Sequence, residues 1–587
     1  MSTKELNGLF SRARAFLDAR LSVVPAGVRE PVAIFASAAA FLWLAFVLAT
    51  EPELPVTAAV LIFCVGLAGF FYAMSQRIAF SLFLSLVLFI ATFATAVFKF
   101  RIAAMNLHVY DIFFYLSGIT ELGFFIQTFS GTAVLFGAIV LTALAVLVWS
   151  FRAEAPHMLG RKASFGIAAL AAALLGGSGW WLGDRRPTFF DDKQFVFSSF
   201  IASLSDLPAL VREKGVLEMS AQAALTPVIS DKISCTAPAG SPDIVLFLNE
   251  SGMPGGIYPN LKYPEELTPF FQSADKQVHK LRVETFGGGT WLSDFSALTG
   301  LSTNSFGNMR NFAMQLMTGR LRHTLPQYLR ACGYETSIVY PSMAEFAGSG
   351  RFYRAIGFDK VIDRSVHKAH DDRQRDGFYY EQVLKVLAKA DEQEVRHPQF
   401  IVASSMSTHG PWDFRYAPEA LKRGEKTVWT GDKEFDEYLW RMVLAKRDRD
   451  DFRAKLKQRY PHNPFLFVSF GDHQPALARL PLKNAQDIAN QGTAWQLDPS
   501  SRAFETYYSV EAMGFTPKLA IPSFPILEIP HLATLAVAAA GLPLDPVYER
   551  RLWLMNQCNG LYTTCGDRGA VLAFQRWMVD SRWIVQR

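Results

Sequence analysis

The first third of the chain contains five long apolar runs with almost no charged residues. A helix that crosses a bilayer needs roughly 20 mainly apolar residues, and each run has about that length. Five such runs in one region are not expected of buried helices in a soluble protein. We therefore predict five transmembrane helices, at about residues 32–50, 56–75, 79–98, 130–150 and 164–183.

A less apolar segment separates the third and fourth runs. Residues 100–128 include the stretch "IAAMNLHVYDIFFYLSG", which is too polar for a clean span and too apolar for a free loop. We interpret this part of the chain as an interfacial or re-entrant segment. The five runs themselves hold almost no ionisable side chains, which a pump or transporter would be expected to carry. The sequence thus favours a membrane anchor and disfavours a conduit.

Basic residues in the short loops predict the orientation of the anchor. Loops rich in Lys and Arg stay in the cytoplasm. The acidic first loop, "EPELP", is expected outside, and Lys99 and Arg101 are exceptions to the rule because they lie in a loop that is also expected outside. Five spans then place everything after about residue 184 outside the cytoplasm. The cytoplasmic side holds Lys4, Arg12, Arg14, Arg20, Arg29, Arg77, Arg152, Arg161 and Lys162.

The remaining chain divides into a connector and a large domain. Residues 1–184 are the predicted anchor, residues 185–240 the connector, and residues 241–587 an extracytoplasmic domain. In this domain, apolar runs of strand length alternate with helical patterns, which is typical of a largely parallel sheet sandwiched by helices. The predicted strands contain "DIVLFLN", "HKLRVETF", "ETSIVYPS", "QFIVASSMS" and "FLFVSFGD"; the predicted helices contain "TLPQYLRACGY", "RDGFYYEQVLKVLAKADEQ" and "PHLATLAVAAAGL".

Charge and cysteine content narrow the class of protein. The formal net charge is +5 over 587 residues and no basic run is present, so we predict no nucleic-acid partner. Four of the five cysteines fall in the exported part, where disulfides persist. The motif "CNGLYTTC" predicts a bridge between Cys558 and Cys565, which leaves Cys235 and Cys332 as the remaining pair.

Chemically active side chains follow four of the predicted strands. Glu250 follows the first strand, Thr290 the second, His409 another, and Asp472 and His473 the last. In α/β folds, ligands bind at the carboxyl ends of the strands. Carboxylate oxygens and imidazole nitrogens suit Zn²⁺ or Mn²⁺. The sequence therefore predicts a metal site at one edge of the sheet.

Three glycines, Gly287 to Gly289, stand directly before Thr290 at the start of a predicted helix. A glycine triplet is often only a flexible bend, and a threonine there is often only a helix cap. The alternative is catalytic. A metal activates a hydroxyl, and the free N–H groups of a helix N-terminus bind phosphate. Glycines would let the chain approach that anion closely.

These motifs carry a family resemblance. In order and spacing, "FLNESG", "GGGTWLSDF", "STHGPW" and "FGDHQP" resemble membrane-anchored phosphotransferases of the alkaline phosphatase/sulfatase superfamily, over about residues 240–545. The lipoteichoic acid synthase-like phosphoglycerol transferases are the most similar group, with phosphoethanolamine transferases next. The resemblance implies an alkaline phosphatase-like catalytic domain facing the periplasm of a bacterium, on a multi-pass inner-membrane anchor with a cytoplasmic N-terminus.

The resemblance also implies roles for individual residues. One divalent ion (Mn²⁺, Zn²⁺ or Mg²⁺) would be held by Glu250, Thr290, Asp472 and His473, with Thr290 as the nucleophile. His409 would contact the substrate phosphate or act as an acid. The implied reaction transfers a headgroup, phosphoglycerol or alternatively phosphoethanolamine, from a membrane phospholipid to an exported glycan or lipid. Diacylglycerol would be released.

The chain departs from the family pattern at the headgroup side. Lipoteichoic acid synthases carry an arginine where this chain has Ser349, and Arg351 is a candidate replacement. Trp412 is a candidate for the headgroup or acceptor pocket, or a core residue. Asp294 is expected on a solvated helix face or as a partner of a ligand.

Other functions fit the sequence less well. A sulfatase needs Cys or Ser at the nucleophile position, where this chain has Thr290. A membrane-anchored phosphodiesterase or other hydrolase would use the same residues with water as the acceptor, and that alternative stays open. A scaffold with a decayed site would be expected to lose at least one metal-type residue, yet all are present.

Overall fold

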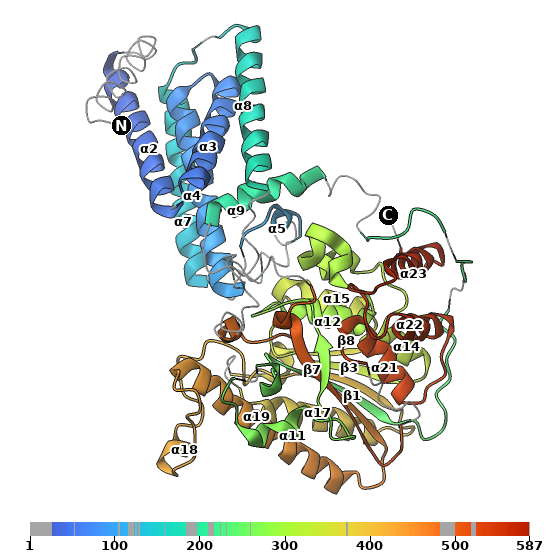
Figure 1. The fold of residues 1–587 in the computed structure, drawn as a ribbon. Helices are drawn as coiled ribbons and strands as arrows, with labels where there is room; N and C mark the ends of the chain where they lie inside the picture. Colours follow the sequence, from blue (N-terminus) through green and yellow to red (C-terminus); the bar gives the residue numbers. More distant parts are fainter. Residues whose placement is uncertain are drawn as a thin grey trace. The chain divides into compact units, whose positions relative to one another are not determined.

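The computed structural model describes most of the chain and resolves it into two compact units, residues 1–211 and residues 212–587 (Figure 1). The described residues are 26–51, 53–103, 106–114, 123, 126, 130–157, 159–183, 196–208, 217–223, 225–229, 232–258, 260–370, 374–479, 481, 499–517 and 524–585.

Long apolar helices make up the first unit. Within the described residues, four of them are long and apolar enough to cross a membrane, and a fifth is apolar over Ile34–Thr50. The N-terminal apolar helices and the C-terminal α/β domain together confirm the predicted fold class. The five helices are α2 (Ala26–Thr50), α3 (Leu54–Ser75), α4 (Ile78–Ala103), α7 (Ser130–Ala153) and α8 (Arg161–Gly183).

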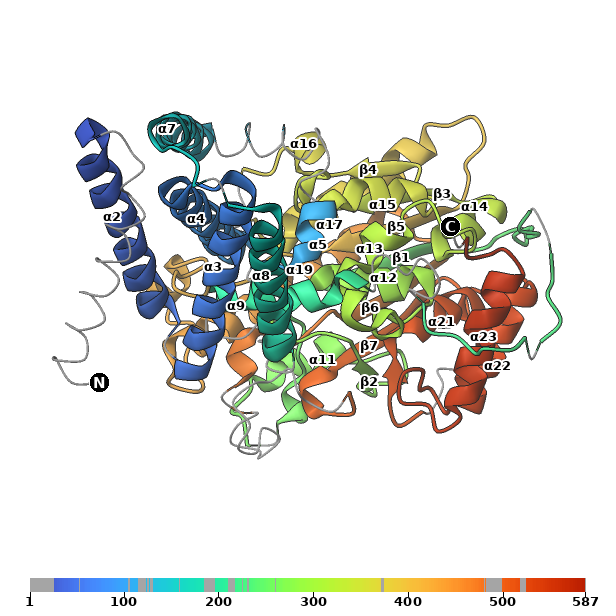
Figure 2. The same cartoon turned by 90° about the horizontal axis from the view of Figure 1, so that it is seen from above.

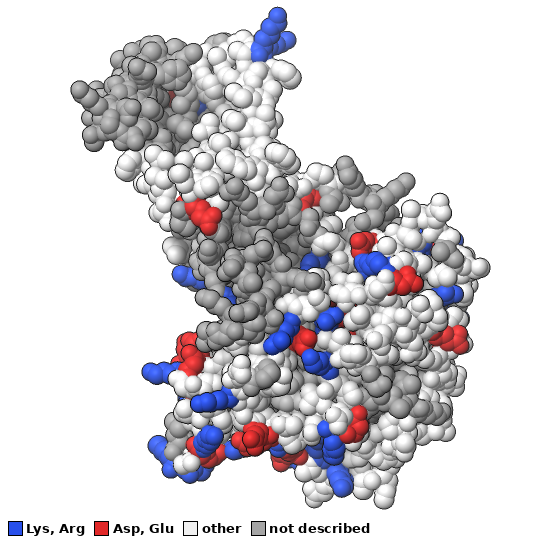
Figure 3. All heavy atoms as spheres, viewed as in Figure 1, with Lys and Arg blue, Asp and Glu red and all other residues white. Residues whose placement is uncertain are grey.

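The outer faces of these helices are apolar. On α7, Val134 is 74% exposed and Leu141 is 69% exposed. Few charged side chains appear on the described part of this unit in Figure 3, whereas Lys, Arg, Asp and Glu are mixed over the second unit. Large exposed apolar surfaces are costly in water but are matched by lipid. The surface of the first unit is therefore suited to a bilayer.

Glycine allows a close contact between two helices of the first unit. A Cβ on Gly66 of α3 would lie 3.1 Å from the Cβ of Leu174 on α8. Glycine at such a contact lets two helix backbones approach.

Glu154 follows α7 and accepts hydrogen bonds from the backbone N–H groups of Ile78, Ala79 and Phe80 at the start of α4.

The segment after the third span begins differently from the prediction. Helix α4 continues to Ala103, so Lys99 lies in a helix and not in a loop. Its ammonium group is 2.7 Å from the carboxylate of Asp111, which lies on the short helix α5 (Val109–Phe114). Apart from residues 123 and 126, the predicted interfacial segment beyond Phe114 lies outside the described residues.

Part of the predicted connector is helical. Residues 184–195 lie outside the described residues, and α9 (Val196–Ser203) and the turn η1 (Leu204–Asp206) follow. Glu51, after α2, accepts hydrogen bonds from the backbone N–H and hydroxyl of Ser198. Asp206 is 3.1 Å from the imidazole of His108. Polar contacts therefore join this segment to the loops of the first unit.

The second unit is built on an eight-stranded sheet with the order β4-β3-β5-β1-β6-β7-β2-β8. The central strands are parallel, and β7 pairs antiparallel with both β6 and β2. The sheet is thus largely parallel, as predicted. The strands are β1 (Asp243–Asn249), β2 (His279–Arg282), β3 (Glu335–Val339), β4 (Lys360–Ile362), β5 (Gln399–Ser404), β6 (Phe465–Gly471), β7 (Glu505–Met513) and β8 (Leu527–Glu528).

Helices cover both faces of this sheet (Figures 1 and 2). The helices over one face include α12 (Thr290–Thr299), α14 (Leu325–Ala331), α15 (Ser349–Ala355) and α21 (Leu532–Ala539); the other face is covered by α11 (Thr268–Phe271), α17 (Asp376–Asp391) and α19 (Lys433–Arg459). Shorter or peripheral helices are α13 (Ala313–Met317), α16 (Arg364–His367), α18 (Glu419–Lys422), α22 (Pro546–Gln557) and α23 (Arg568–Asp580).

The core of the second unit lies between the sheet and these helices. Every residue of β1, β5 and β6 is buried, which explains why their sequences are apolar without alternation. Two disulfides close the unit. They join Cys558 to Cys565 and Cys235 to Cys332, the two pairs that the sequence predicts.

Candidate active site

Adjacent parallel strands bring the candidate site residues together. Strands β5 and β6 flank β1, and Asn249 at the end of β1 is paired with Gly471 at the end of β6. Glu250 and Asp472 are the next residues of their strands, so both emerge at the carboxyl edge of the sheet. This edge is where α/β folds bind ligands.

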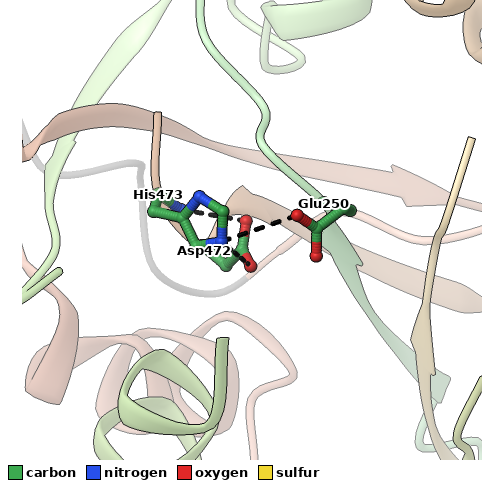
Figure 4. Close-up of side chains that lie close together, drawn as sticks. All are labelled: Glu250, Asp472 and His473. Atoms are coloured by element: carbon green, nitrogen blue, oxygen red, sulfur yellow. Dashed lines mark hydrogen bonds and ion pairs between the residues drawn. The ribbon is translucent and has the colours of Figure 1, made fainter. Parts of the chain in front are cut away.

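Three of the predicted metal ligands form a compact, buried group (Figure 4). The ligand atoms of Glu250, Asp472 and His473 lie within 4.8 Å of one another. The Nε2 atom of His473 is 3.2 Å from Oδ2 of Asp472 and 3.5 Å from Oε1 of Glu250. All three side chains are buried. Residues more than 200 positions apart in the sequence therefore lie next to one another.

The predicted nucleophile lies against this group. The hydroxyl of Thr290 donates a hydrogen bond to Oε2 of Glu250 at 3.2 Å and lies 3.4 Å from Nε2 of His473. Thr290 itself is only partly buried. The structure thus assembles all four residues that the sequence singles out.

The hydrogen bonds around this group fit a divalent cation. The Nδ1 atom of His473 is 2.9 Å from the carbonyl of Gln474, which can only accept, so Nδ1 carries a proton and Nε2 is the nitrogen that faces the two carboxylates. Oδ2 of Asp472 is buried with no hydrogen-bond donor. Buried acceptors facing one another are costly unless a proton or a cation lies between them.

Burial and mutual charge shift the pKa values in this group. Burial, and after it the charge of Glu250, raises the pKa of Asp472 to about 7. Burial alone would raise the pKa of Glu250, but the charges of His473 and His409 and nearby hydroxyl groups lower it. For His473, the neighbouring carboxylates outweigh burial and raise the pKa. Strongly perturbed groups gathered at a strand edge are typical of functional sites.

The glycine triplet has a structural requirement at every position. Gly287, Gly288 and Gly289 have φ angles of 71°, 154° and 86°, which side-chain-bearing residues rarely adopt. A Cβ on Gly287 would also lie 3.3 Å from Ala476. The backbone N–H of Gly287 donates to the carbonyl of Gln474. The triplet therefore shapes the chain against the segment that carries Asp472.

The triplet leads directly into helix α12. Gly289 takes the N-cap position, and Thr290 is the first helical residue. Thr290 is therefore not the N-cap residue of α12, the structural role that was the alternative to a catalytic one. Its hydroxyl instead points to Glu250, beside the free N–H groups and positive dipole end of a ten-residue helix. That environment favours an anion.

His409 is an exposed residue of the loop after β5. Its Nδ1 atom is 2.6 Å from the carbonyl of Gly410, so Nδ1 carries a proton and Nε2 remains for a substrate. The base of the loop is joined to Glu250: Ser405 accepts from its backbone N–H, and the hydroxyl of Thr408 donates to its carbonyl. The same loop thus serves His409 and a predicted metal ligand.

Comparison with known proteins identifies the domain. Residues 242–500 match the Sulfatase family model. They form a sulfatase domain. This match agrees with the alkaline phosphatase/sulfatase superfamily that the motifs resemble. Thr290 stands where a sulfatase would need Cys or Ser.

The chain is also similar to individual proteins. It is 24% identical over 249 residues to an uncharacterised protein of Haemophilus influenzae, a match that spans 40% of this chain and 44% of that relative. It is similar to the phosphoglycerol transferase GacH of Streptococcus pyogenes, with 16% identity, 60% and 89% coverage and a TM-score of 0.45. The phosphoethanolamine transferase EptA of Neisseria meningitidis has 13% identity, 92% and 97% coverage and a TM-score of 0.43.

The other residues singled out by the sequence occupy different surroundings in the sulfatase domain. Trp412 is partly buried, packs against Tyr438 and donates to the carbonyl of Thr408. Arg351 is exposed in the first turn of α15. A role for either one in headgroup binding stays a prediction.

Asp294 is not on a solvated helix face, contrary to one expectation. Its carboxylate is buried and accepts a hydrogen bond of 2.6 Å from the hydroxyl of Tyr353. Burial raises its pKa to about 7 despite that hydrogen bond. Asp294 therefore joins α12 to α15 and is not part of the candidate metal group.

Sequence reasoning missed two residues that hold the His409 loop. Oδ1 of Asp376 accepts hydrogen bonds from the backbone N–H groups of Met406 and Ser407. Arg441 of α19 donates to the carbonyl of His409. Asp376 begins a predicted helix, which was a usable signal for a polar contact. Arg441 lies inside the apolar run "YLWRMVLA", which was a usable signal that this arginine is buried.

Proposed function

We propose that this chain is a metal-dependent phosphotransferase that moves a phospholipid headgroup through a covalent intermediate on Thr290. The observation that carries the proposal is the position of the Thr290 hydroxyl. It lies within hydrogen-bonding distance of Glu250 and His473, at the start of α12, on a residue that is only partly buried. A hydroxyl placed only for stability would not need this set of neighbours.

Glu250, Asp472, His473 and Thr290 would hold one divalent ion, Mn²⁺, Zn²⁺ or Mg²⁺. When bound, the ion would lower the pKa of the hydroxyl and offset the negative charge of the phosphate. The donor set of two carboxylates, one imidazole and one hydroxyl fits all three ions, so the proposal does not depend on which one is present.

The first half of the reaction would transfer the headgroup to the protein. The Thr290 oxygen attacks phosphorus, its proton passes to solvent, and the bond from phosphorus to the diacylglycerol oxygen breaks. His409, protonated at Nε2, gives its proton to that leaving oxygen. The N–H groups at the start of α12 offset charge on the phosphoryl oxygens.

The second half would pass the headgroup to an acceptor. A hydroxyl of an exported glycan or lipid attacks phosphorus and gives its proton to Nε2 of His409. The bond between phosphorus and the Thr290 oxygen breaks, and that oxygen regains a proton from solvent. Water in place of the acceptor would make the same site a hydrolase.

Two headgroup donors remain under the proposal. "GDHQP" resembles the phosphoglycerol enzymes, and "STHGPW" resembles the phosphoethanolamine enzymes. Phosphoglycerol is the first choice. The membrane helices support a bilayer phospholipid as the donor, because a soluble donor would require no anchor. An orientation with the sulfatase domain in the periplasm belongs to the same proposal.

The test reconstitutes the full chain in vesicles that contain labelled phosphatidylglycerol or labelled phosphatidylethanolamine. We expect diacylglycerol release from one donor, a loss of at least about 1,000-fold in Thr290→Ala, and retained measurable turnover in Thr290→Ser, which keeps a hydroxyl. Turnover that survives Thr290→Ala would overturn the proposal. Label recovered only as free headgroup phosphate, with an acceptor extract present, would favour the hydrolase.

A further inference from the structure

The long helix α19 carries an arginine that is almost completely buried. Arg441 is among the largest fully buried side chains of the described residues. Burying a guanidinium is costly unless its N–H groups find acceptors. The contacts of Arg441 therefore indicate its structural role.

All three donor positions of Arg441 are used, and two of them hold the loop of His409. Nη1 donates to the backbone carbonyl of His409 and Nη2 to that of Phe414, both at 2.9 Å. Nε donates to Oε1 of Glu437 at 2.9 Å, one turn earlier on the same helix. The planar guanidinium thus contacts the loop at two residues, His409 and Phe414.

Aromatic rings fix the plane of this guanidinium. Its central carbon lies 4.3 Å from the ring centre of Phe414 and 4.5 Å from that of Tyr416. Oε1 of Glu437 also accepts the backbone N–H of Tyr416, and its other oxygen is 3.0 Å from Nε of Arg415. The ion pair between Arg441 and Glu437 on α19 therefore also forms hydrogen bonds with the backbone of residues 409–416.

The His409 loop is held at its two ends by different groups. Glu250 and Asp376 hold its beginning, through Ser405 to Thr408. From His409 onward, Arg441 donates to the carbonyls of His409 and Phe414, and Glu437 accepts the N–H of Tyr416. The imidazole of His409 itself is exposed, so its own packing does little to fix it.

We propose that Arg441 is a positioning residue, which places the imidazole of His409 over the phosphorus attacked by Thr290. The inference rests on the proposed function. Arg441 does not touch the substrate. It fixes the peptide to which the imidazole is attached, and an error of about 1 Å in a catalytic group costs about 100-fold in rate.

An arginine is required for this role because of its geometry. Three acceptors lie around one plane, and only a guanidinium presents donors to all of them from a single rigid group. A lysine would keep the charge beside Glu437 but would contact fewer acceptors. We therefore expect Arg441→Lys to be folded and intermediate in rate, and Arg441→Met to be slower.

The matched control is a second buried arginine on the same helix. Arg449 also donates to backbone carbonyls, those of Pro269 and Phe270, and its guanidinium carbon lies 4.3 Å from the ring centre of Phe270. Its acceptors belong to α11 and not to the His409 loop. Arg449→Met therefore also leaves buried carbonyl groups without their donors, but these carbonyls are not in the His409 loop, so His409 should not move.

The experiment measures diacylglycerol release by the full chain in vesicles, in wild-type and His409→Ala backgrounds. We expect Arg441→Met to lower kcat by about 10- to 100-fold in the wild-type background and by less than about 2-fold when His409 is absent. Arg449→Met should lower the rate by the same factor in both backgrounds. Melting curves of each variant correct for the folded fraction, and Arg441→Lys replaces Arg441→Met if the latter does not fold.

An equal loss from the Arg441 substitution in both backgrounds would overturn the inference, because the residue would then act on stability alone. A His409→Ala variant with full activity would overturn it too, because there would be no catalytic imidazole to place. Failure of the proposed function looks different: Thr290→Ala would then retain turnover, whatever the Arg441 variants do.

Discussion

At the scale of single residues, the candidate site is a group of acceptors arranged around one point. Thr290, Glu250, Asp472 and His473 come from three separate segments, yet their polar atoms lie within hydrogen-bonding or ion-pair distance. The buried Oδ2 of Asp472 has no hydrogen-bond donor. A bound cation would remove this cost, so the affinity for metal should depend strongly on Asp472.

We predict that Asp472→Asn lowers the affinity for metal by more than the about 10- to 100-fold that loss of a supporting group causes. An amide keeps the shape but removes the charge. Metal per chain, measured by plasma mass spectrometry after dialysis, should fall from one ion to almost none. The control is Asp294→Asn, which alters a buried carboxylate bound to Tyr353 and should retain the ion. Equal metal content in both variants would contradict the predicted ligand set.

The residues of this group were predictable because each one directly follows a strand or a glycine turn. Burial of the strands gives continuous apolar runs, and a polar residue at the end of such a run is conspicuous. Arg441 was not predictable in the same way. It lies in the apolar run "YLWRMVLA", which sets it apart from the other arginines of α19, but its acceptors on the His409 loop are brought near only by tertiary packing.

At the scale of elements, two loops deliver the chemistry. The glycine turn positions Thr290, and the loop after β5 positions His409. The beginning of the second loop depends on Asp376, the first residue of α17, whose carboxylate accepts the N–H groups of Met406 and Ser407. Burial, offset in part by these hydrogen bonds, raises the pKa of Asp376 to about 6, against an ordinary value of 3.8.

This shift predicts how stability depends on pH. Because the pKa is higher in the folded state, folding is favoured by protonation, and the contribution of Asp376 to stability falls as the pH rises from about 4 to about 6. The fall amounts to about 3 kcal/mol, since one pKa unit corresponds to about 1.4 kcal/mol. Asp376→Asn cannot ionise and should lose this dependence.

The measurement is the unfolding free energy of the full chain in detergent, from denaturant titrations at pH 4 and pH 7. The stability of the wild type relative to Asp376→Asn should drop between these values. Ser407→Ala is the control, because it removes the hydroxyl that accepts the N–H of Asp376 but no ionising group. A difference that does not change with pH would contradict the raised pKa.

Elements with a single strong pattern were the ones that the sequence predicted. The run "DIVLFLN" corresponds to β1, and the helical pattern before "DEQ" to α17. Strand β7 was missed because its residues 505–513 mix polar and apolar positions without a strict alternation. Helix α19 was missed because its sequence is highly charged. Both lie where tertiary contacts decide the structure.

At the scale of the whole molecule, the apolar helices of the first unit and the disulfides of the second indicate different environments. The first unit matches lipid, and disulfides persist outside the cytoplasm. The two bridges differ in the chain length that they close: 97 residues for Cys235–Cys332 and 7 for Cys558–Cys565.

Loop length predicts which bridge matters more for stability. On the chain-entropy account, closing 97 residues stabilises by about 5 kcal/mol and closing 7 by about 2 kcal/mol. Replacing Cys235 and Cys332 by serine should therefore lower the melting temperature more than replacing Cys558 and Cys565. Calorimetry of the full chain in detergent checks the order. The reverse order would show that the entropic account does not hold here.

The proposed orientation predicts a protease pattern. With the sulfatase domain in the periplasm, protease added to spheroplasts should cleave residues 212–587 and leave the apolar helices. Inside-out vesicles should protect the same region. An epitope at the N-terminus should show the opposite accessibility. Cleavage of the sulfatase domain from the cytoplasmic side would contradict the orientation read from the loop charges.

The most direct test of the account is the mass of the Thr290 peptide. The full chain is incubated with metal and with either phosphatidylglycerol or phosphatidylethanolamine, quenched in acid, digested and analysed by mass spectrometry. The account predicts a headgroup-phosphate adduct on Thr290 with one of these donors, together with released diacylglycerol and no adduct in Thr290→Ala. Donor turnover with an unmodified Thr290 peptide, or an adduct on another residue, would contradict the proposed covalent mechanism.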